Sequence, residues 1–210
     1  MRHFLYVSLV VFGLCHGTGA FARGLFTAEL FLGAAHNLNS DVTVRQEGQE
    51  DLTLRGGWET RPFEQPLYWM IRLGYREPSN SWEIQLTHHK LYLSNLPPEI
   101  QQLEITHGFN LLTFNYAKRD LPVLLRAGVG VVLPHLTAIV RGEELTSGGF
   151  SITGPAFLGG VGKELPVTRH FFFALEGQLT LAWATAKVEG GEVETMNAAF
   201  HALVGIGVAL

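Results

Sequence analysis

The fold is decided by the stretch MNAAFHALVGIGVAL, residues 196–210. Its side chains alternate without a break, so that one face carries only apolar groups: Met196, Ala198, Phe200, Ala202, Val204, Ile206, Val208 and Leu210. A period of two over this length indicates a β-strand with one apolar face. The strand is too long for a typical soluble sheet. It is typical of a wall strand in an outer-membrane β-barrel, whose outer face meets hydrocarbon.

The composition agrees with a protein that is embedded in lipid. The chain is 47% apolar and only 16% charged, which is low in charge for a soluble domain. No segment reaches the eighteen or so apolar residues expected of a transmembrane helix. A barrel accounts for both facts, because half of each wall strand faces lipid. The formal charge of −4 gives no support for nucleic-acid binding. The sequence contains no phosphate-binding loop motif, so nothing in it indicates a nucleotide cofactor.

The N-terminal region predicts export. A short basic start precedes an apolar run over residues 4–14, and Ala20-Phe21-Ala22 supplies an A-x-A cleavage site. We therefore expect a signal peptide over residues 1–22 and a barrel over residues 23–210. Cys15, the only cysteine, would leave with the signal peptide, which excludes disulfides and cysteine metal sites from the mature chain.

Periodicity predicts eight wall strands, which is an even number and gives the smallest kind of antiparallel up-and-down transmembrane barrel. Their expected ranges are 24–35, 66–76, 82–92, 104–118, 122–133, 150–165, 170–187 and 195–210. The residues expected to face the lumen include Glu29, Arg72, Glu83, Arg126, Glu176 and His201. Because an unpaired buried charge is costly, we expect these groups to pair as a structural plug rather than to line a conducting pore.

Connection lengths predict the orientation, because barrels of this type have short periplasmic turns and longer outer loops. The longer connections include residues 36–65, 93–103, 141–149 and 188–194, which places the odd-numbered strands running outward. The first of them is long enough for its own hairpin, with arms at 42–45 and 52–58. Polar and histidine residues then collect near one rim: His36, Asn37, Ser40, Asp41, His88, His89, Lys90, His107, Asn110 and His135.

Two interpretations of this rim remain open. Its polar residues could simply meet lipid headgroups, or its histidines could bind a metal ion or move protons near neutral pH. His88 and Lys90 share the outward register of Trp82 and Leu86, whereas His89 shares the inward one. No histidine is followed by a serine two positions later, which counts against a hydrolase of the His-x-Ser type. A triad assembled from separate strands stays open.

The ordered motifs of the chain resemble the rhizobial-type lipid A oxidase group of small outer-membrane barrels. The specific parts of the resemblance are T-H-x-K at 87–90, G-x-N-L-L-T-x-N at 108–115 and P-H at 134–135. Less specific parts lie at 37–42, 128–133 and 154–156. In that family a barrel in the bacterial outer membrane uses dioxygen to oxidise the proximal glucosamine of lipid A to an aminogluconate unit. The resemblance implies that lipid A of the outer leaflet is the partner.

The resemblance implies a set of site residues at the outer rim. The catalytic residues it implies are His88, Lys90, Asn110 and His135. The residues expected to bind substrate are Asn37, Ser40 and Asp41. An oxidase without cysteine, haem or nucleotide motifs would most simply use a redox-active divalent metal such as iron, copper or manganese. We expect its ligands to be His88, His107 and His135, with Asp41 as a further carboxylate, although the family would have an acidic residue at position 107.

Two rival functions are kept beside the oxidase. One is a non-catalytic structural or adhesive barrel, in which the rim histidines can be replaced without functional consequence. The other is a lipid A deacylase, which requires a reactive serine or threonine at the rim. The sequence leaves the oligomeric state open, because lipid-facing and subunit-facing surfaces look alike, and a monomer is assumed.

Overall fold

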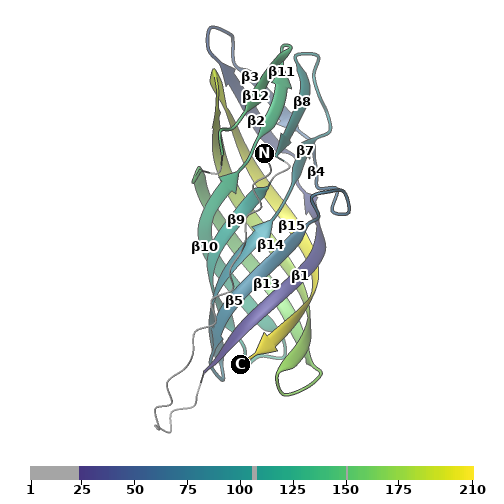
Figure 1. The fold of residues 1–210 in the computed structure, drawn as a ribbon, viewed down its shortest axis with the longest axis vertical. Helices are drawn as coiled ribbons and strands as arrows, with labels where there is room; N and C mark the ends of the chain where they lie inside the picture. Colours follow the sequence, from purple (N-terminus) through teal and green to yellow (C-terminus); the bar gives the residue numbers. More distant parts are fainter. Residues whose placement is uncertain (1–23, 106–107, 150) are drawn as a thin grey trace, which may run out of the picture.

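The computed structural model describes residues 24–105, 108–149 and 151–210. Eight long antiparallel strands form a closed barrel (Figure 1). They are β1 (Leu25–Asn37), β5 (Trp69–Arg76), β6 (Asn80–His88), β9 (Phe109–Lys118), β10 (Leu124–Pro134), β13 (Gly154–Pro166), β14 (Phe171–Val188) and β15 (Gly191–Ala209). Each strand pairs with the next one in this order, and β15 pairs again with β1. The expected fold class is therefore confirmed.

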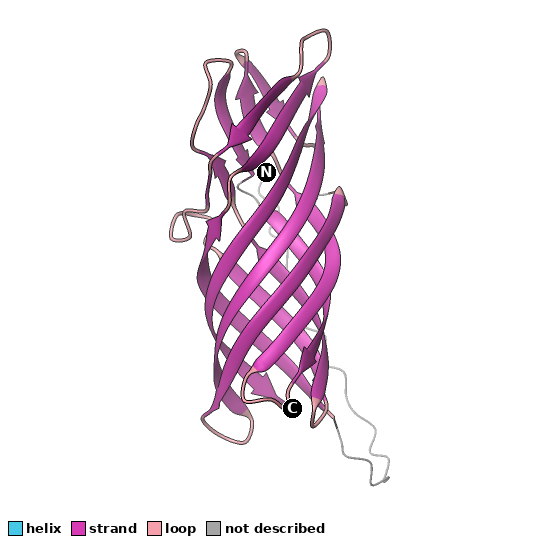
Figure 2. Ribbon diagram, turned by 180° about the vertical axis from the view of Figure 1, so that it is seen from behind, coloured by secondary structure: helices cyan, strands magenta, loops and turns pink. Residues whose placement is uncertain are grey.

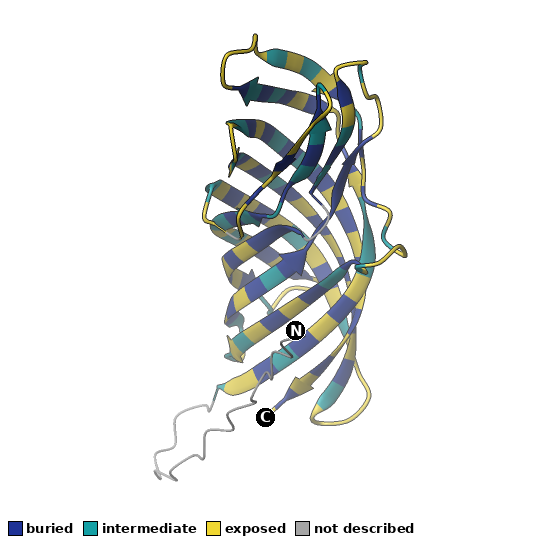
Figure 3. Cartoon of the chain, turned by 45° about the horizontal axis from the view of Figure 1, so that its top comes forward, coloured by how far each residue is buried: buried dark blue, intermediate teal, exposed yellow. Residues whose placement is uncertain are grey.

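The wall strands alternate between a lipid-facing and a luminal side, which Figure 3 shows as bands of exposed and buried residues along each strand. On β5, Ile71, Leu73 and Tyr75 are exposed while Arg72 between them is fully buried. On β15, Phe200, Val204 and Ile206 are exposed while His201 and Leu203 are buried. Within the described residues, no helix is long and apolar enough to cross a membrane.

The lumen of the barrel is filled by an ion network, as expected. We define this network as Glu29, Arg72, Glu83, Arg126 and Glu176, all of them buried. Arg72 lies 3.0 Å from Glu29, 3.4 Å from Glu83 and 2.9 Å from Glu176, and Arg126 lies 2.5 Å from both Glu83 and Glu176. Because each carboxylate has an arginine partner, the narrow lumen holds charge without leaving a group unpaired.

A second ion cluster lies at the end of the barrel that carries the short connections. Glu164 accepts hydrogen bonds from Arg76 at 2.7 Å and from Arg119 at 2.6 Å. These groups bring the number of arginines and glutamates inside the barrel to four of each. The interior is thus balanced in charge from the ion network to the periplasmic turns.

The outer end of the molecule forms a cap of seven short strands in two sheets (Figures 1 and 2). Strands β2 (Ser40–Gln46) and β3 (Leu52–Gly56) extend the barrel sheet beyond β15, and they are the predicted hairpin of the first outer segment. The other sheet has the order β12-β11-β8-β7-β4. Its strands are β4 (Trp58–Glu59), β7 (Leu91–Leu93), β8 (Ile100–Ile105), β11 (Thr137–Val140) and β12 (Glu143–Thr146).

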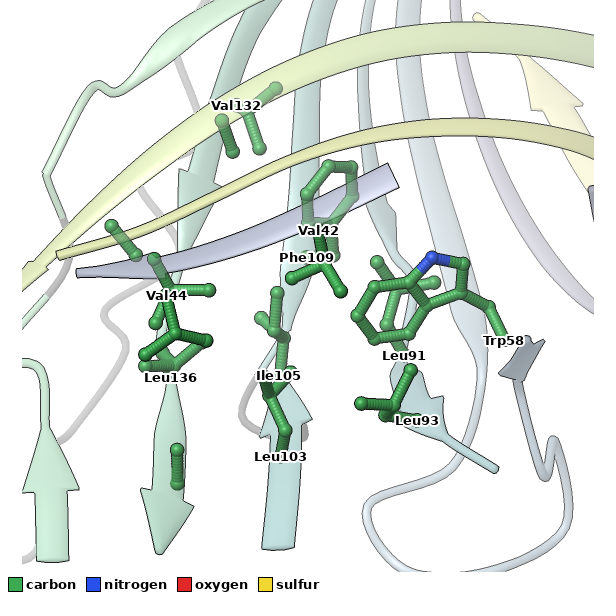
Figure 4. Packing of buried hydrophobic residues seen from close by; sticks show 14 of the residues in the cluster. Val42, Val44, Trp58, Leu91, Leu93, Leu103, Ile105, Phe109, Val132 and Leu136 are labelled. Carbon is green, nitrogen blue, oxygen red and sulfur yellow. The ribbon is translucent and has the colours of Figure 1, made fainter. Parts of the chain in front are cut away.

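The two sheets of the cap enclose an apolar cluster, which we call the outer core (Figure 4). Its larger members are Val42, Val44, Trp58, Leu91, Leu93, Ile100, Leu103, Ile105, Phe109, Leu111, Val132, Leu136, Val140 and Leu145. The inside of the chain therefore changes character along its axis. Inside the wall the ion network lies beside a smaller apolar cluster, whereas the inside of the cap is apolar. The smaller cluster consists of Phe31, Tyr68, Met70, Phe172, Ala174 and Leu203.

The observed strands correct the predicted ranges in two places. The single strand expected at 104–118 is divided into β8, which ends at Ile105, and β9, which begins at Phe109. The strand expected at 82–92 is likewise divided, because β6 ends at His88 and β7 begins at Leu91. The predicted signal peptide, residues 1–22, lies outside the described residues.

Candidate functional site at the outer rim

Four of the predicted site residues lie where β6, β9 and β10 reach the cap, in the outward register or just beyond the strand ends, and three of them, His88, Lys90 and Asn110, are buried. Trp69 pairs with His88, and Asn110 pairs with Leu133. His135 follows two positions after Leu133, and Lys90 two positions after His88. We define the rim cluster as Trp69, His88, Lys90, Asn110 and His135. The outward register predicted for His88 is observed.

The geometry of His88 assigns its proton. Its ring lies parallel to the indole of Trp69, with centroids 5.2 Å apart and an interplanar angle of 15°. Asn110 Nδ2 donates to the carbonyl of Leu133 at 3.3 Å, so its Oδ1 is the atom that faces His88 Nδ1, at 2.8 Å. His88 Nδ1 therefore carries the hydrogen and donates it, which puts the lone pair on Nε2.

Gly108 explains why a glycine precedes the Asn110 motif. Its φ of 120° is in the region that favours glycine. A Cβ at this position would lie 2.1 Å from Asn110 Oδ1, so any other residue would displace the amide that orients His88. The carbonyl of Gly108 also accepts a hydrogen bond from the backbone amide of His135 at 3.0 Å. One glycine thus supports both neighbouring site residues.

Lys90 is covered by the segment that leads from the cap into β5. Its Nζ donates to the carbonyl of Glu64 at 2.8 Å and lies 5.4 Å from the ring centre of Tyr92. The guanidinium group of Arg61 also lies over the Tyr92 ring, 4.4 Å from its centre. Lys90 is fully buried, and desolvation lowers its pKa below the ordinary value, against the opposing effect of the Glu64 carboxylate. Its present contacts hold the 60–67 segment beside the rim cluster.

The three residues expected to bind substrate do not lie together. Asn37 faces the interior, where its Oδ1 accepts from His89 Nε2 at 2.9 Å and from Asn197 Nδ2 at 3.0 Å. Ser40 is buried and accepts a hydrogen bond from Trp58 Nε1 at 2.9 Å. Asp41 is exposed on β2. None of the three has a contact with the rim cluster among the described residues.

An inner polar layer lies between the ion network and the outer core, and it contains His201, which the sequence placed in the lumen as part of the charged plug. His201 is buried between Tyr68 and Thr180. Its Nδ1 lies 2.7 Å from the hydroxyl oxygen of Tyr68, and its Nε2 lies 2.7 Å from the hydroxyl oxygen of Thr180. The ring of His89 lies 5.1 Å from that of His201. Asn197 on β15 and His89 after β6 are far apart in sequence, so only their inward parity could have suggested that they meet. These groups are enclosed and do not face the membrane.

A metal centre has only part of its expected donors in the described chain. His88 and His135 lie on the same face of the rim cluster, and His107, the third expected ligand, lies outside the described residues. Asp41 lies on β2 and pairs with Arg55 at 3.4 Å. In the ranges 24–105, 108–149 and 151–210, no three His, Cys, Asp or Glu side chains are grouped to hold a metal ion. The His88–Asn110 contact is nevertheless the type of outer contact that fixes a metal-binding histidine.

Hydrolytic chemistry finds little support in the contacts of the described serines and threonines. Ser40 and Ser147 are buried, and Ser147 Oγ accepts from the backbone amide of Leu136 at 3.0 Å. Thr180 does contact a histidine, His201, but both are enclosed in the lumen. A nucleophile at that position would not reach an acyl chain in the outer leaflet.

Comparisons with known proteins add evidence on the fold. No family model matches the chain, and no curated protein matches it in sequence. The outer membrane protein AlkL, solved in DMPC bilayers, has a TM-score of 0.52 at 8% identity, covering 96% of this chain and 97% of its own. Neisserial surface protein A has a TM-score of 0.40 at 15% identity, covering 87% of this chain and 96% of its own. The Ail protein of Yersinia pestis has a TM-score of 0.41 at 11% identity, covering 90% of this chain and 99% of its own.

The closed wall and its apolar exterior define the class of protein. The chain is an eight-stranded β-barrel of the bacterial outer membrane. The similarity to AlkL is one of fold, since so few residues are shared.

Proposed function

We propose that the protein acts on lipid A of the outer leaflet and catalyses oxygen-dependent oxidation of its proximal glucosamine. The contact between His88 and Asn110 on the outward face of the wall carries this proposal. The imidazole is in the outward register at the level of the cap but is buried, so in this proposal a headgroup of the outer leaflet reaches it from the lipid side after the covering side chains move aside. The resemblance of the T-H-x-K, G-x-N and P-H motifs to the lipid A oxidase group supports the same chemistry.

The reaction balances with dioxygen as the oxidant. Two electrons and two protons leave the anomeric carbon and its hydroxyl group, a lactone forms, and dioxygen is reduced to hydrogen peroxide. Water then opens the lactone, so the acid product has one oxygen more than the sugar. The substrate must have a free anomeric hydroxyl group, because a phosphate there would leave no proton to remove.

In this proposal His88 accepts the proton of the anomeric hydroxyl at Nε2, since Asn110 holds the hydrogen on Nδ1. Trp69 fixes the plane of the His88 ring by stacking. Lys90 acts as a positioning residue that holds the 60–67 segment over the cluster through the carbonyl of Glu64. Asn37 and Ser40 face the interior and have a structural role. Asp41 contacts headgroups at another place on the barrel surface.

A redox-active divalent metal, iron, copper or manganese, belongs to the proposal, with His107 and His135 as its histidine ligands, because Nε2 of His88, the third ligand expected from the sequence, takes the proton instead. Bound there, it would supply the single-electron steps that dioxygen requires. Refolded protein incubated with each metal and then desalted should retain about one ion per chain, and His135→Ala should lower this content. Elemental analysis that found none of the three metals on folded wild type would remove the metal from the proposal.

The activity is tested by mass spectrometry of lipid A with a free anomeric hydroxyl group, incubated with refolded protein in air and under nitrogen. We expect a gain of one oxygen in air only. His88→Gln should lower the rate by about a hundredfold, the usual contribution of a general base. His170→Gln is the matched control, because His170 lies at a periplasmic turn, where it bonds to the carbonyl of Ala209.

Other outcomes decide for the rival functions. Product in both atmospheres, or equal rates for His88→Gln and wild type, would overturn the oxidase. Loss of an acyl chain in both atmospheres would instead establish a deacylase. Unchanged lipid A with correctly folded barrel would favour a structural or adhesive protein, in which the rim cluster is a headgroup-facing surface.

A further inference from the structure

The outer rim has a concave surface on β13, β14, β15 and β2, away from the rim cluster. It is a groove of about 370 Å³, whereas the rim cluster lies on β5, β6, β9 and β10. We call it the outer groove. Its volume is within the range of small-molecule sites. Asp41, which the sequence placed among the substrate-binding residues, lines this groove.

The outer groove is built from two rows of outward-facing side chains. In the upper row Thr43, Glu194 and Thr185 are neighbours across three strands, because Glu194 pairs with both threonines. In the lower row Trp183 pairs with Met196. The upper row therefore offers hydroxyl and carboxylate oxygens, and the lower row offers an indole and a thioether.

The level of the groove in the membrane follows from β14. The lipid-facing residues Phe173, Leu175 and Leu179 of this strand are about half exposed, and Trp183 is the last large apolar side chain in their row. Above it the row continues with Thr185 and Lys187. Trp183 thus marks the boundary between the acyl chains and the headgroups, where tryptophan is favoured.

The polar groups of the groove retain capacity to bind a ligand. Glu194 accepts from Arg45 at 2.9 Å and Asp41 from Arg55 at 3.4 Å, and each carboxylate still has lone pairs available. Arg45 also pairs with Asp51 and Glu192, so it neutralises Glu194 only in part. Thr153 also lines the groove.

The floor of the groove depends on Gly154. A Cβ at this position would lie 2.1 Å from the carbonyl oxygen of Trp183, so only glycine lets the start of β13 approach β14 this closely. Trp183 is further supported by Phe157, with ring centroids 6.1 Å apart at 86°. The indole is therefore held in place and presents one side to the groove.

We propose that the outer groove is a saccharide-binding site that takes a sugar ring without an adjacent phosphate. The apolar face of a sugar ring would lie on Trp183 and Met196, and its hydroxyl or amino groups would bond to Glu194, Asp41 and the threonines. Carboxylates disfavour a phosphate at this position, and two arginine-paired carboxylates do not form a cation site. The site is independent of the proposed oxidase, because it lies on other strands, away from the rim cluster.

The test is NMR of the tryptophan indole N–H groups in refolded ¹⁵N-labelled protein, with Trp183→Phe used to assign the signal. Titration with unphosphorylated glucosamine disaccharide should shift the Trp183 signal to saturation and leave that of Trp82 unmoved. Glu194→Gln should weaken binding by about tenfold, the usual loss for a hydrogen bond to a charged group. Thr43→Val serves as a second variant and should also weaken binding.

Glu192→Gln is the matched control. Glu192 is also bonded to Arg45, at 2.8 Å, but lies outside the outer groove. The affinity of the Glu192→Gln variant for the disaccharide should stay within about twofold of the wild-type value. Equal losses for the Glu192 and Glu194 variants, or a Trp183 signal that moves neither with the disaccharide nor in discs that contain lipopolysaccharide, would overturn the proposal.

The source of the saccharide is distinguished by nanodiscs. A shift of the Trp183 signal by the free disaccharide assigns the site to soluble saccharides as well as glycolipids. A shift only in discs that contain lipopolysaccharide assigns it to a membrane-anchored sugar. The same shift in discs of phosphatidylglycerol alone would make the groove a general lipid contact and would overturn the proposal.

Discussion

Arg72 is the residue around which the barrel interior is arranged. It is fully buried on β5 and lies within 3.4 Å of three carboxylates, which come from β1, β6 and β14. Gln85 Oε1 accepts further hydrogen bonds from its guanidinium group at 2.9 and 3.2 Å. The planar group has five donors, and this environment uses them as a shorter or more flexible cation could not.

Replacing this residue should therefore be costly. We expect Arg72→Met to lower the free energy of unfolding by about 3 to 5 kcal/mol, because it leaves buried carboxylates without a partner. Urea unfolding in detergent micelles or bilayers, followed by tryptophan fluorescence, measures the change. Arg55→Met is the control, since the exposed Arg55–Asp41 pair should contribute at most about 1 kcal/mol. Equal values for both variants would show that the ion network adds no stability.

At the residue scale the sequence predicted which side of the wall each side chain faces, but not which individual residues it contacts. The inward parity of Glu29, Arg72 and Glu176 could be counted along each strand, because a period of two leaves no choice of face. The contacts of Tyr68 with His201 and of His89 with Asn37 join distant segments. Such contacts depend on strand order and register, which alternation alone does not specify.

At the scale of elements, the cap is a small unit with its own core. Trp58 is 6% exposed within the outer core, and its Nε1 donates to Ser40. Figure 4 shows its ring beside Leu91 and Leu93, between the two sheets. The β2–β3 hairpin was predicted, but the other five cap strands escaped prediction as separate strands because each has only two to six residues. Their inward faces are also apolar, the reverse of the pattern in the wall.

The core of the cap should be separable from the barrel. We expect Trp58→Ala to destabilise the cap by about 3 to 5 kcal/mol, as for a buried aromatic residue. Limited proteolysis within residues 46–52 should then become faster, while the folded barrel keeps its mobility in unheated SDS gels. Phe63→Ala should change neither property, because Phe63 is 88% exposed. Loss of the folded band in the Trp58 variant would mean that cap and barrel unfold as one unit.

At the scale of the whole molecule, the eight predicted wall strands agree with the observed ones to within a few residues at most ends. Lipid on one side and a packed lumen on the other impose the same alternation along every wall strand. Each wall strand can therefore be predicted from its own sequence, without knowing which strands pair with it. The rim cluster was partly predictable for the same reason. His88 and Asn110 occupy outward positions and His135 follows β10 in the same register. Asn37 instead lies in the inward register of β1, and Ser40 lies in the inward register of β2.

The ion network also bears on how the barrel is assembled. Its five charged side chains are contributed by β1, β5, β6, β10 and β14, so they neutralise one another only when these strands stand in their final register. A chain that enters the membrane with β14 misplaced by one residue turns Glu176 toward lipid and deprives both arginines of a counter-ion. A wall closed in the wrong register is therefore disfavoured, because it leaves charged side chains in lipid or without a counter-ion.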